Sequence, residues 1–371
     1  MTTAALNWKK VFLIAGSLCA CYMGAGFTSG QEVLQFFTSL GAMGLAAIAI
    51  SWVIFIYFTY MIYKVSKEQN FKDPYDILEY YCGKILGRAM VWYIVALMYG
   101  VYLIMITGAG ATINQYYGVP ISVGVWAMSI LTLVTVVLGI EKLINIIGVI
   151  GPVKVLFIVV VCAPSLFVLL SSPTVLSEVD RILPTLAVKK AASNWALSGL
   201  LYPCLYVMTA VPFMVACGVA ATNIKESIIA GIAGITGFMI SVFMLVVAEL
   251  VNIQAIAGKQ IPTLVIADKV SSSLGVLFSI LIILCIYSTA CSFLWSVVRK
   301  FAEDKTKKSY ILATSLAAIG MFFGEIIPFD VLVNTLYPPS GYVGIIFLVS
   351  IIIKQFKDKY GTASKNDSTT G

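Results

Sequence analysis

Charged residues are scarce in this sequence of 371 residues, and histidine is absent. Only 11% of the residues are charged and 60% are hydrophobic, whereas a soluble domain carries roughly 25% charged residues. A chain with so little charge cannot cover itself with a polar surface, so we expect it to lie in a lipid bilayer. The net charge of +7 comes from loops between apolar runs, so it does not indicate nucleic-acid binding.

Residues that carry out catalysis or hold metal ions are scarce as well. The eight cysteines form no CxxC pair, and most of them lie in apolar runs, as small packing residues do. Without histidine, and without a pair of carboxylates in the apolar runs, the sequence offers no catalytic constellation. We therefore expect neither an enzyme nor a bound cofactor, with a coupling sodium ion as the one exception to consider.

Ten apolar runs are long enough to cross a membrane, which takes about 20 residues each. The runs are 9–39, 41–63, 89–117, 120–140, 143–170, 194–221, 226–251, 273–298, 309–327 and 331–353. Most of the 24 Lys and Arg residues then fall on the side that holds both termini, which indicates that the termini are cytoplasmic. We expect a single all-α domain over residues 1–371, crossing the cell membrane many times and ending in a cytoplasmic tail at 354–371.

The first run contains an unusual cluster of small and polar residues, CYMGAGFTSGQE. Gly24, Gly26 and Gly30 each lower helix stability by roughly 1 kcal/mol relative to alanine. Irregular backbone at membrane depth is tolerated only where it lines a cavity or is buried in protein. The cluster therefore predicts two half-helices, about 9–22 and 30–39. The alternative is an unbroken helix whose glycines allow close packing against a neighbour.

Glu32 in this cluster has two interpretations. It stands three residues after Ser29, which is the spacing of a capping box, so it could cap the second half-helix. It could instead carry a proton, because an ionisable group at membrane depth is a functional hypothesis by default. The ends of half-helices also suit charged ligands, since free carbonyls bind cations and helix N-termini bind carboxylates. Such broken helices are typical of secondary transporters.

The sixth run predicts a second interruption. Pro203 and Pro212 bracket residues 206–211, and a proline inside a helix kinks or breaks it. Because the two interrupted runs are five runs apart, we expect an inverted repeat whose halves cover about 9–170 and 194–353. The alternative for this run is an ordinary proline kink.

The eighth run carries hydroxyl and thiol groups on one helical face. Cys285, Ser288, Thr289 and Ser292 are spaced i, i+3, i+4 and i+7. A single Ser or Thr in a membrane helix often bonds only a carbonyl of its own helix. Four such residues in register favour a binding role.

These features resemble a known group of membrane proteins. Two five-helix halves with broken first and sixth helices resemble the LeuT-fold amino acid–polyamine–organocation transporter superfamily. Within it, GAGFTSGQEVLQFF at 24–37 and TGAGAT at 107–112 resemble the YkvI-like family of bacterial membrane proteins. The resemblance covers essentially the whole chain and implies alternating access around a pocket at the two breaks.

The resemblance also implies two neighbouring sites. The solute pocket would be lined by Tyr22, Gly24, Ala25, Gly26, Leu103, Thr107, Val207, Thr209 and Ala210. A sodium ion would bind the carbonyls of Ala20, Met23 and Cys285 and the hydroxyls of Ser288 and Thr289. Five oxygens suit a small hard cation, and mostly neutral, apolar walls favour a small zwitterion or a neutral solute.

Lys154 raises the question of which ion is coupled. It lies about 11 residues into the fifth run, which corresponds to a depth of about 16 Å. In some relatives of the superfamily, a lysine on the fifth helix replaces sodium, and such members are proton-coupled or sodium-independent. If Lys154 faces Ser288 it would repel sodium and could itself carry the proton; if it faces elsewhere, sodium stays possible. The alternative is a lysine in a wet cytoplasmic vestibule.

The sequence therefore favours a secondary transporter that couples a cation, sodium or a proton, to the symport of a small organic solute such as an amino acid. The first alternative is a sensor of the same fold that binds a solute without net transport. A channel would need a continuous polar stripe, whereas these runs are polar only near mid-depth. The expected partners are the lipid bilayer and the solute, with no nucleic acid, and the oligomeric state stays open.

Overall fold

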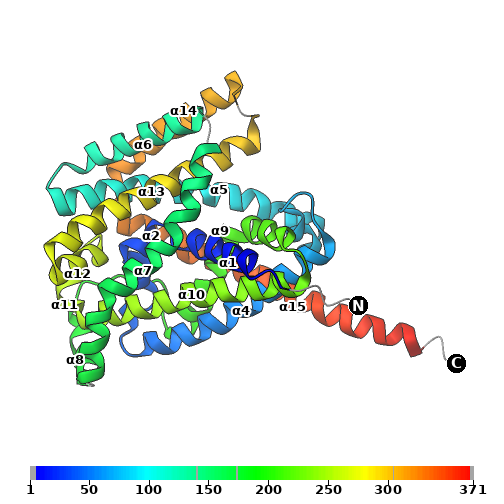
Figure 1. Cartoon of the computed structure of the whole chain (residues 1–371), viewed down its shortest axis with the longest axis horizontal. Helices are drawn as coiled ribbons and strands as arrows, with labels where there is room; N and C mark the ends of the chain where they lie inside the picture. Colours follow the sequence, from blue (N-terminus) through cyan, green and yellow to red (C-terminus); the bar gives the residue numbers. More distant parts are fainter. Residues whose placement is uncertain (1–5, 139–140, 173, 304, 368–371) are drawn as a thin grey trace.

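The computed structural model describes residues 6–138, 141–172, 174–303 and 305–367, and gives the backbone alone for 20, 25, 141–153 and 360–367. Every element in these ranges is helical (Figure 1). The elements are α1 Trp8–Tyr22, α2 Ala25–Ser29, α3 Gln31–Phe36, η1 Thr38–Leu40, α4 Met43–Gln69, α5 Asp76–Tyr117, α6 Ile121–Leu138, α7 Glu141–Ser171, α8 Thr174–Ile182, η2 Leu183–Thr185, α9 Trp195–Ala220, α10 Ile224–Val251, α11 Ile253–Ile256, α12 Pro262–Val270, α13 Ser272–Phe301, α14 Lys307–Ile326 and α15 Phe329–Asp367.

Nine helices in the described part of the chain are long and apolar enough to cross a membrane. They are α4, α5, α6, the part of α7 from Lys154 onward, α9, α10, α13, α14 and α15, and they match the second to tenth predicted runs. The first predicted run is divided among α1, α2 and α3, of which the longest has 15 residues. The predicted break in the first helix is thus confirmed.

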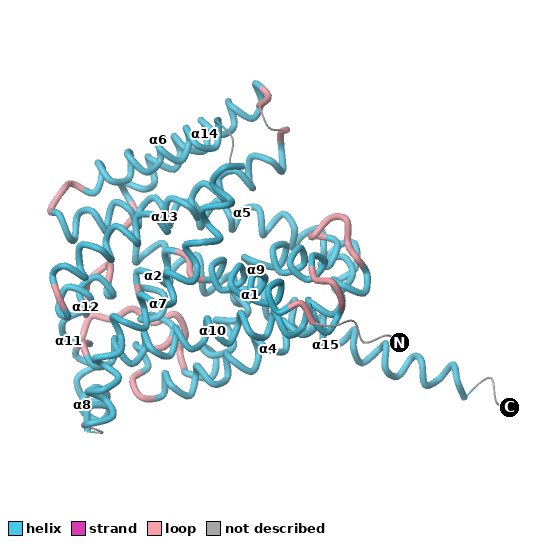
Figure 2. The backbone as a smooth tube through the Cα atoms, viewed as in Figure 1, coloured by secondary structure: helices cyan, strands magenta, loops and turns pink. Residues whose placement is uncertain are grey.

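The helices form one bundle around α1 (Figure 1). α1 packs against α10, α7 and α9, while α6 and α14 lie side by side at one edge, next to α5 and α13. Both ends of the chain lie at one end of the bundle, and the short helices α8, α11 and α12 lie at the opposite end (Figure 2).

Aromatic side chains fill the centre of the bundle where α1 ends. The ring of Tyr22 lies 5.6 Å from Phe55 on α4, 5.4 Å from Phe238 on α10 and 5.1 Å from Tyr206 on α9, measured between ring centroids. All four side chains are buried. Aromatic pairs at such distances and tilts add stability beyond the burial of their surface. The last residue of α1 is therefore held in place by three other helices.

The predicted break in the sixth run is wrong, because α9 is one helix from Trp195 to Ala220 with both prolines inside it. Pro203 has no N–H, so the carbonyl of Gly199, four residues earlier, has no partner within the helix. The hydroxyl of Ser51 on α4 donates to that carbonyl at 2.8 Å. A donor from a neighbouring helix thus satisfies the backbone group that the proline leaves free, and α9 continues.

Ser51→Ala should destabilise the protein by about 1–3 kcal/mol, because the Gly199 carbonyl would stay buried without a donor. The midpoint of thermal unfolding in detergent should fall. Thr314→Ala is the matched control, since Thr314 is exposed and its hydroxyl donates to the Tyr310 carbonyl of its own helix at 2.8 Å. Equal midpoints for the two variants would contradict this role of Ser51.

Candidate functional site

The backbone leaves the helical path immediately after α1. The Met23 N–H makes the last helical bond of α1, to the Cys19 carbonyl at 3.1 Å, but Met23 has ψ of 56° and Gly24 is extended with ψ of −172°, so the helix does not continue into α2. The Gly24 carbonyl accepts the N–H and the hydroxyl of Thr28, at 2.9 and 2.8 Å, and so belongs to α2. The Met23 carbonyl lies between the two helices and depends on other donors.

Lys154 on α7 supplies the main donor to this carbonyl. Its ammonium nitrogen Nζ donates to the Met23 carbonyl at 2.8 Å, and the side chain is 3% exposed. The ammonium also lies close to the thiol of Cys285 on α13. A side chain this buried does not fit the alternative of a wet vestibule. Lys154 therefore faces the group of residues for which the sequence predicted a cation site.

The other predicted cation ligands are partly brought together. The Cys285 carbonyl accepts the hydroxyl of Ser288 at 2.9 Å, which is a bond within α13. Thr289 turns toward the cavity described next, with its methyl group near Gly24. Ala20, whose carbonyl was the remaining predicted ligand, lies in the last turn of α1, three residues before Met23. Lys154 thus contacts one predicted carbonyl ligand, that of Met23, directly.

A small cavity lies beside the break. The cavity volume is about 40 Å³, counted as the space that the centre of a water molecule could occupy. This is enough room for water but not for an amino acid, because one water needs roughly 10–15 Å³ by the same measure. The lining residues come from α1–α3, α5, α9, α13 and α15, and they are Cys21, Tyr22, Gly24, Gly26, Glu32, Val101, Met105, Leu205, Tyr206, Thr209, Thr289, Phe293 and Tyr337.

Several residues predicted to line the pocket do line this cavity, namely Tyr22, Gly24, Gly26 and Thr209. The side chain of Ala25 lies outside the described residues. Val207 and Ala210 do not line this cavity, because in a continuous α9 the residues Leu205, Tyr206 and Thr209 share the cavity face.

Leu103 and Thr107 on α5 do not line the cavity either. Both side chains lie near glycines of α14, Leu103 near Gly320 and Thr107 near Gly324. The Thr107 hydroxyl donates to two carbonyls of its own helix, at 2.9 and 3.0 Å. The cavity face of α5 is formed by Val101 and Met105, one helical turn apart.

Glu32 is the acidic residue of the cavity lining. Tyr202 and Tyr206 of α9 both donate their hydroxyls to its oxygen Oε1, the first at 2.9 Å. The capping-box interpretation is wrong, because α3 begins after Gly30 with no side-chain cap. The N–H of Gln31 donates to the hydroxyl of Ser29 at 3.2 Å, and Glu32 points to the cavity. Its role as a proton carrier stays a prediction.

A second buried carboxyl, Glu249 near the end of α10, was missed in the sequence. It is 0% exposed, and Thr38 donates its hydroxyl to Oε2 at 2.6 Å. The expectation that the apolar runs hold no pair of carboxylates is therefore wrong, because Glu249 and Glu32 are close enough to interact electrostatically. The signal was available: Glu249 is an acid inside the long apolar run ISVFMLVVAELV.

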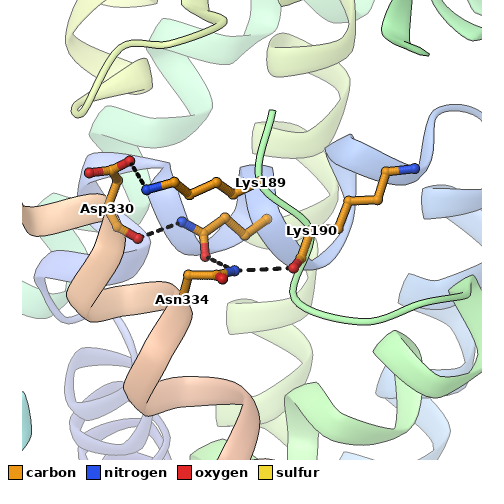
Figure 3. Close-up of polar contacts among 5 residues, drawn as sticks. Lys189, Lys190, Asp330 and Asn334 are labelled. Atoms are coloured by element: carbon orange, nitrogen blue, oxygen red, sulfur yellow. Dashed lines mark hydrogen bonds and ion pairs between the residues drawn. The ribbon is translucent and has the colours of Figure 1, made fainter. Parts of the chain in front are cut away.

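Polar contacts seal the far end of α3 (Figure 3). Gln35 donates from Nε2 to the Asp330 carbonyl at 3.1 Å and accepts from Asn334 at 3.0 Å, both on α15. Its own carbonyl accepts the N–H of Ala191 at 3.0 Å. Lys189 forms an ion pair with the Asp330 carboxylate at 2.6 Å. The segment before α9 is therefore fastened over α3 and the start of α15.

The chain is similar to two proteins of Bacillus subtilis strain 168, while no family model matches it. It is 23% identical over 337 residues to the uncharacterized membrane protein YkvI, covering 90% of this chain and 92% of YkvI. It is 24% identical over 361 residues to the uncharacterized protein YyaD, covering 96% and 98%. The predicted resemblance to YkvI-like proteins is confirmed.

The fold is similar to that of a solved transporter. Two variants of a manganese transporter from Eremococcus coleocola superpose with a TM-score of 0.53, covering 93% of this chain and 79% of theirs. The sequence identity of 15% restricts the likeness to the fold. Among the described residues, no group of three or more acidic or cysteine side chains is placed to hold a metal ion.

Gly30→Ala should destabilise the protein more than Gly118→Ala does. Both glycines have positive φ, +82° and +70°, where a side chain costs about 1–2 kcal/mol. A Cβ on Gly30 would also lie 2.6 Å from Glu249 Oε1 and 2.9 Å from the Thr263 methyl group, whereas nothing lies within 4 Å of one on Gly118. The difference between the unfolding midpoints of the two variants measures the effect of crowding at Gly30. Equal decreases in the two midpoints would contradict this prediction.

Proposed function

We propose that this chain, which resembles YkvI-like membrane proteins over nearly its whole length, is a secondary transporter of a small organic solute such as an amino acid. The observation that carries the proposal is the small cavity at the break between α1 and α2. A solute at this point can contact backbone groups that no regular helix would offer it. The fold shared with a membrane transporter supports the same reading.

The solute is proposed to be organic because of the chemistry of the lining. The cavity offers one carboxyl, one thiol, hydroxyls of Thr and Tyr, and aromatic rings. Manganese is named for the structural neighbour, but a divalent transition ion is normally held by several N, O or S ligands at once. Aromatic faces and hydroxyls suit a compact solute with an amino group, for which Glu32 would be the countercharge.

The coupling ion is proposed to be the proton rather than sodium. The ammonium of Lys154 lies 2.8 Å from the Met23 carbonyl, where a sodium ion would otherwise find a ligand. A second positive charge about 4 Å away would be repelled by about 4 kcal/mol at an effective dielectric constant of 20. That penalty corresponds to roughly a thousandfold loss in sodium affinity.

The contacts of α3 and the small size of the cavity support alternating access. The contacts of Gln35 with Asp330 and Asn334 fasten the far end of α3 to α15, and the cavity is too small for an amino acid. Loading therefore requires α1–α3 to separate from the helices around them. We propose that the end holding both termini faces the cytoplasm, since most of the positive loops lie there. The two five-helix halves stay part of this proposal.

Sodium should not stabilise the native protein. Unfolding midpoints measured in sodium and in choline at matched ionic strength should agree for the native chain. Lys154→Ala should have a lower midpoint in choline and recover part of the loss in sodium, because an ion that binds only the folded state stabilises it by mass action. Lys154→Met replaces the ammonium with an uncharged side chain of similar length, and so separates the loss of the charge from a loss of packing. Sodium-specific stabilisation of the native chain would reject proton coupling.

Proteoliposomes should accumulate a labelled amino acid when the outside is acidic. A panel of amino acids would be tested with an inward proton gradient, with an inward sodium gradient and with a protonophore. We expect uptake with the first, none with the second alone, and loss of uptake with the third. An amino acid that raises the unfolding midpoint but shows no uptake or counterflow would favour the sensor instead.

A further inference from the structure

Glu249 is a buried acid that neither the cavity nor the predicted cation site uses. Its oxygen Oε2 accepts the hydroxyl of Thr38, and its oxygen Oε1 has no hydrogen-bond partner among the described residues. The side chain is completely buried, although it stands only two residues before the end of α10. A carboxyl in this position requires a physical explanation, because buried polar atoms are nearly always paired.

The start of α3 and α12 close over the free oxygen. A Cβ on Gly30 would lie 2.6 Å from Oε1, 2.9 Å from the Thr263 methyl group and 3.2 Å from Pro262. Only the absence of a side chain at Gly30 lets the backbone pass this close. Thr263 also donates its hydroxyl to the Thr28 carbonyl at 2.7 Å, which ties α12 to the end of α2.

Of the groups that act on Glu249, only one hydroxyl favours a negative charge. The titratable residues that interact with it electrostatically are Glu32 on α3 and Cys162 on α7. From η1 it receives one hydroxyl, that of Thr38. Among the described residues of α1, α4, α8, α9, α11 and α12, which also pack against α10, none forms an ion pair with it.

A carboxylate with a single donor and no cation is strongly disfavoured in such a place, whereas a neutral carboxylic acid is tolerated. Two neighbouring carboxyls also resist carrying charge together. We propose that Glu249 is a proton-binding site, occupied while α3 is packed against α10 and α12, and emptied into water when α3 separates from them.

This site would couple the proton to the movement of α3. Glu32 belongs to α3 and faces the cavity, whereas Glu249 on α10 lies against Gly30 and Thr38, the residues that flank α3 at its two ends. The far end of the same helix is held by the contacts of Gln35 (Figure 3). Proton binding and closure would then stabilise each other, by the reciprocity that linkage demands. The proposal rests on the proposed function only for the identity of the coupled ion.

Infrared spectroscopy of the purified full-length protein tests the protonation directly. A protonated carboxyl gives a carbonyl stretch that a carboxylate lacks, so the native protein should show such a band from Glu249 at neutral pH. Glu249→Gln should lose that component, while Glu32→Gln and the exposed Glu178→Gln should keep it. An unchanged band in Glu249→Gln would overturn the proposal. If Glu249→Gln does not fold, Thr38→Val should shift the band, and no shift would overturn the proposal.

Hydrogen–deuterium exchange tests the link to movement. Exchange of the amides in residues 25–40 would be followed against pH, relative to an unstructured reference peptide. At pH values above about 4.3, where a glutamic acid in water ionises, opening should rise in the native protein by up to about tenfold per pH unit for as long as the closed state keeps its proton, because each opening then releases one proton. Glu249→Gln, whose side chain cannot ionise, should remove that rise, and Glu178→Gln should retain it. Identical pH profiles for the native protein and Glu249→Gln would overturn the link.

These readouts are independent of transport. Failure of amino-acid uptake with the infrared band intact would reject the proposed solute or function and leave the proton site standing. Sodium-driven uptake together with loss of the band in Glu249→Gln would leave the proton site but separate it from coupling.

Discussion

A backbone carbonyl at membrane depth must find a donor inside the protein, and the arrangement around α1 depends on this requirement. α1 stops at Tyr22, and the Met23 carbonyl belongs to neither α1 nor α2. The ammonium of Lys154 satisfies it from α7, at 2.8 Å. An unpaired carbonyl there would cost about 1–3 kcal/mol, and a buried ammonium without acceptors would cost more. The break and the buried lysine therefore stabilise each other.

The same requirement explains why α9 does not break. Pro203 frees the Gly199 carbonyl, but Ser51 on the neighbouring helix restores a donor, so the helix continues. The cavity thus has an uninterrupted wall on the α9 side and an interrupted one on the α1–α3 side. Tyr202 and Tyr206 join the two walls through Glu32. Movement that opens the cavity is easier on the side where the helix is already divided.

Much of the fold was readable from the sequence because it rests on local rules. The run lengths predicted ten spanning segments, of which the second to tenth are spanning helices in the described part of the chain, and three glycines predicted the divided first run. The sixth run misled because a proline signals a missing hydrogen bond, while the replacement comes from Ser51, about 150 residues away in sequence. Such long-range compensation has no local pattern.

Less of the candidate site could be predicted from the sequence, because it depends on contacts between residues that are distant in the chain. The lining of the cavity follows from helical phase once α9 is known to be continuous, which is why Thr209 lines it and Val207 does not. The facing direction of Lys154 was open because it depends on how α7 packs against α1. Glu249 was visible as an acid in an apolar run, but its meaning appears only when Gly30 and Thr38 are seen to enclose it.

Lys154 also places a positive charge at a point where the backbone of α1 favours one. The C-terminal end of a helix carries partial negative charge and stabilises a nearby cation by about 0.3–1 kcal/mol, more when partly buried. The Met23 carbonyl, next to the end of α1, therefore favours a cation of some kind. A free ion could bind at this carbonyl and then dissociate, whereas the ammonium of Lys154 is covalently attached to α7 and stays. Under the proposed function, the quantity that changes between inward and outward states must then be a proton on a side chain rather than an ion in the site.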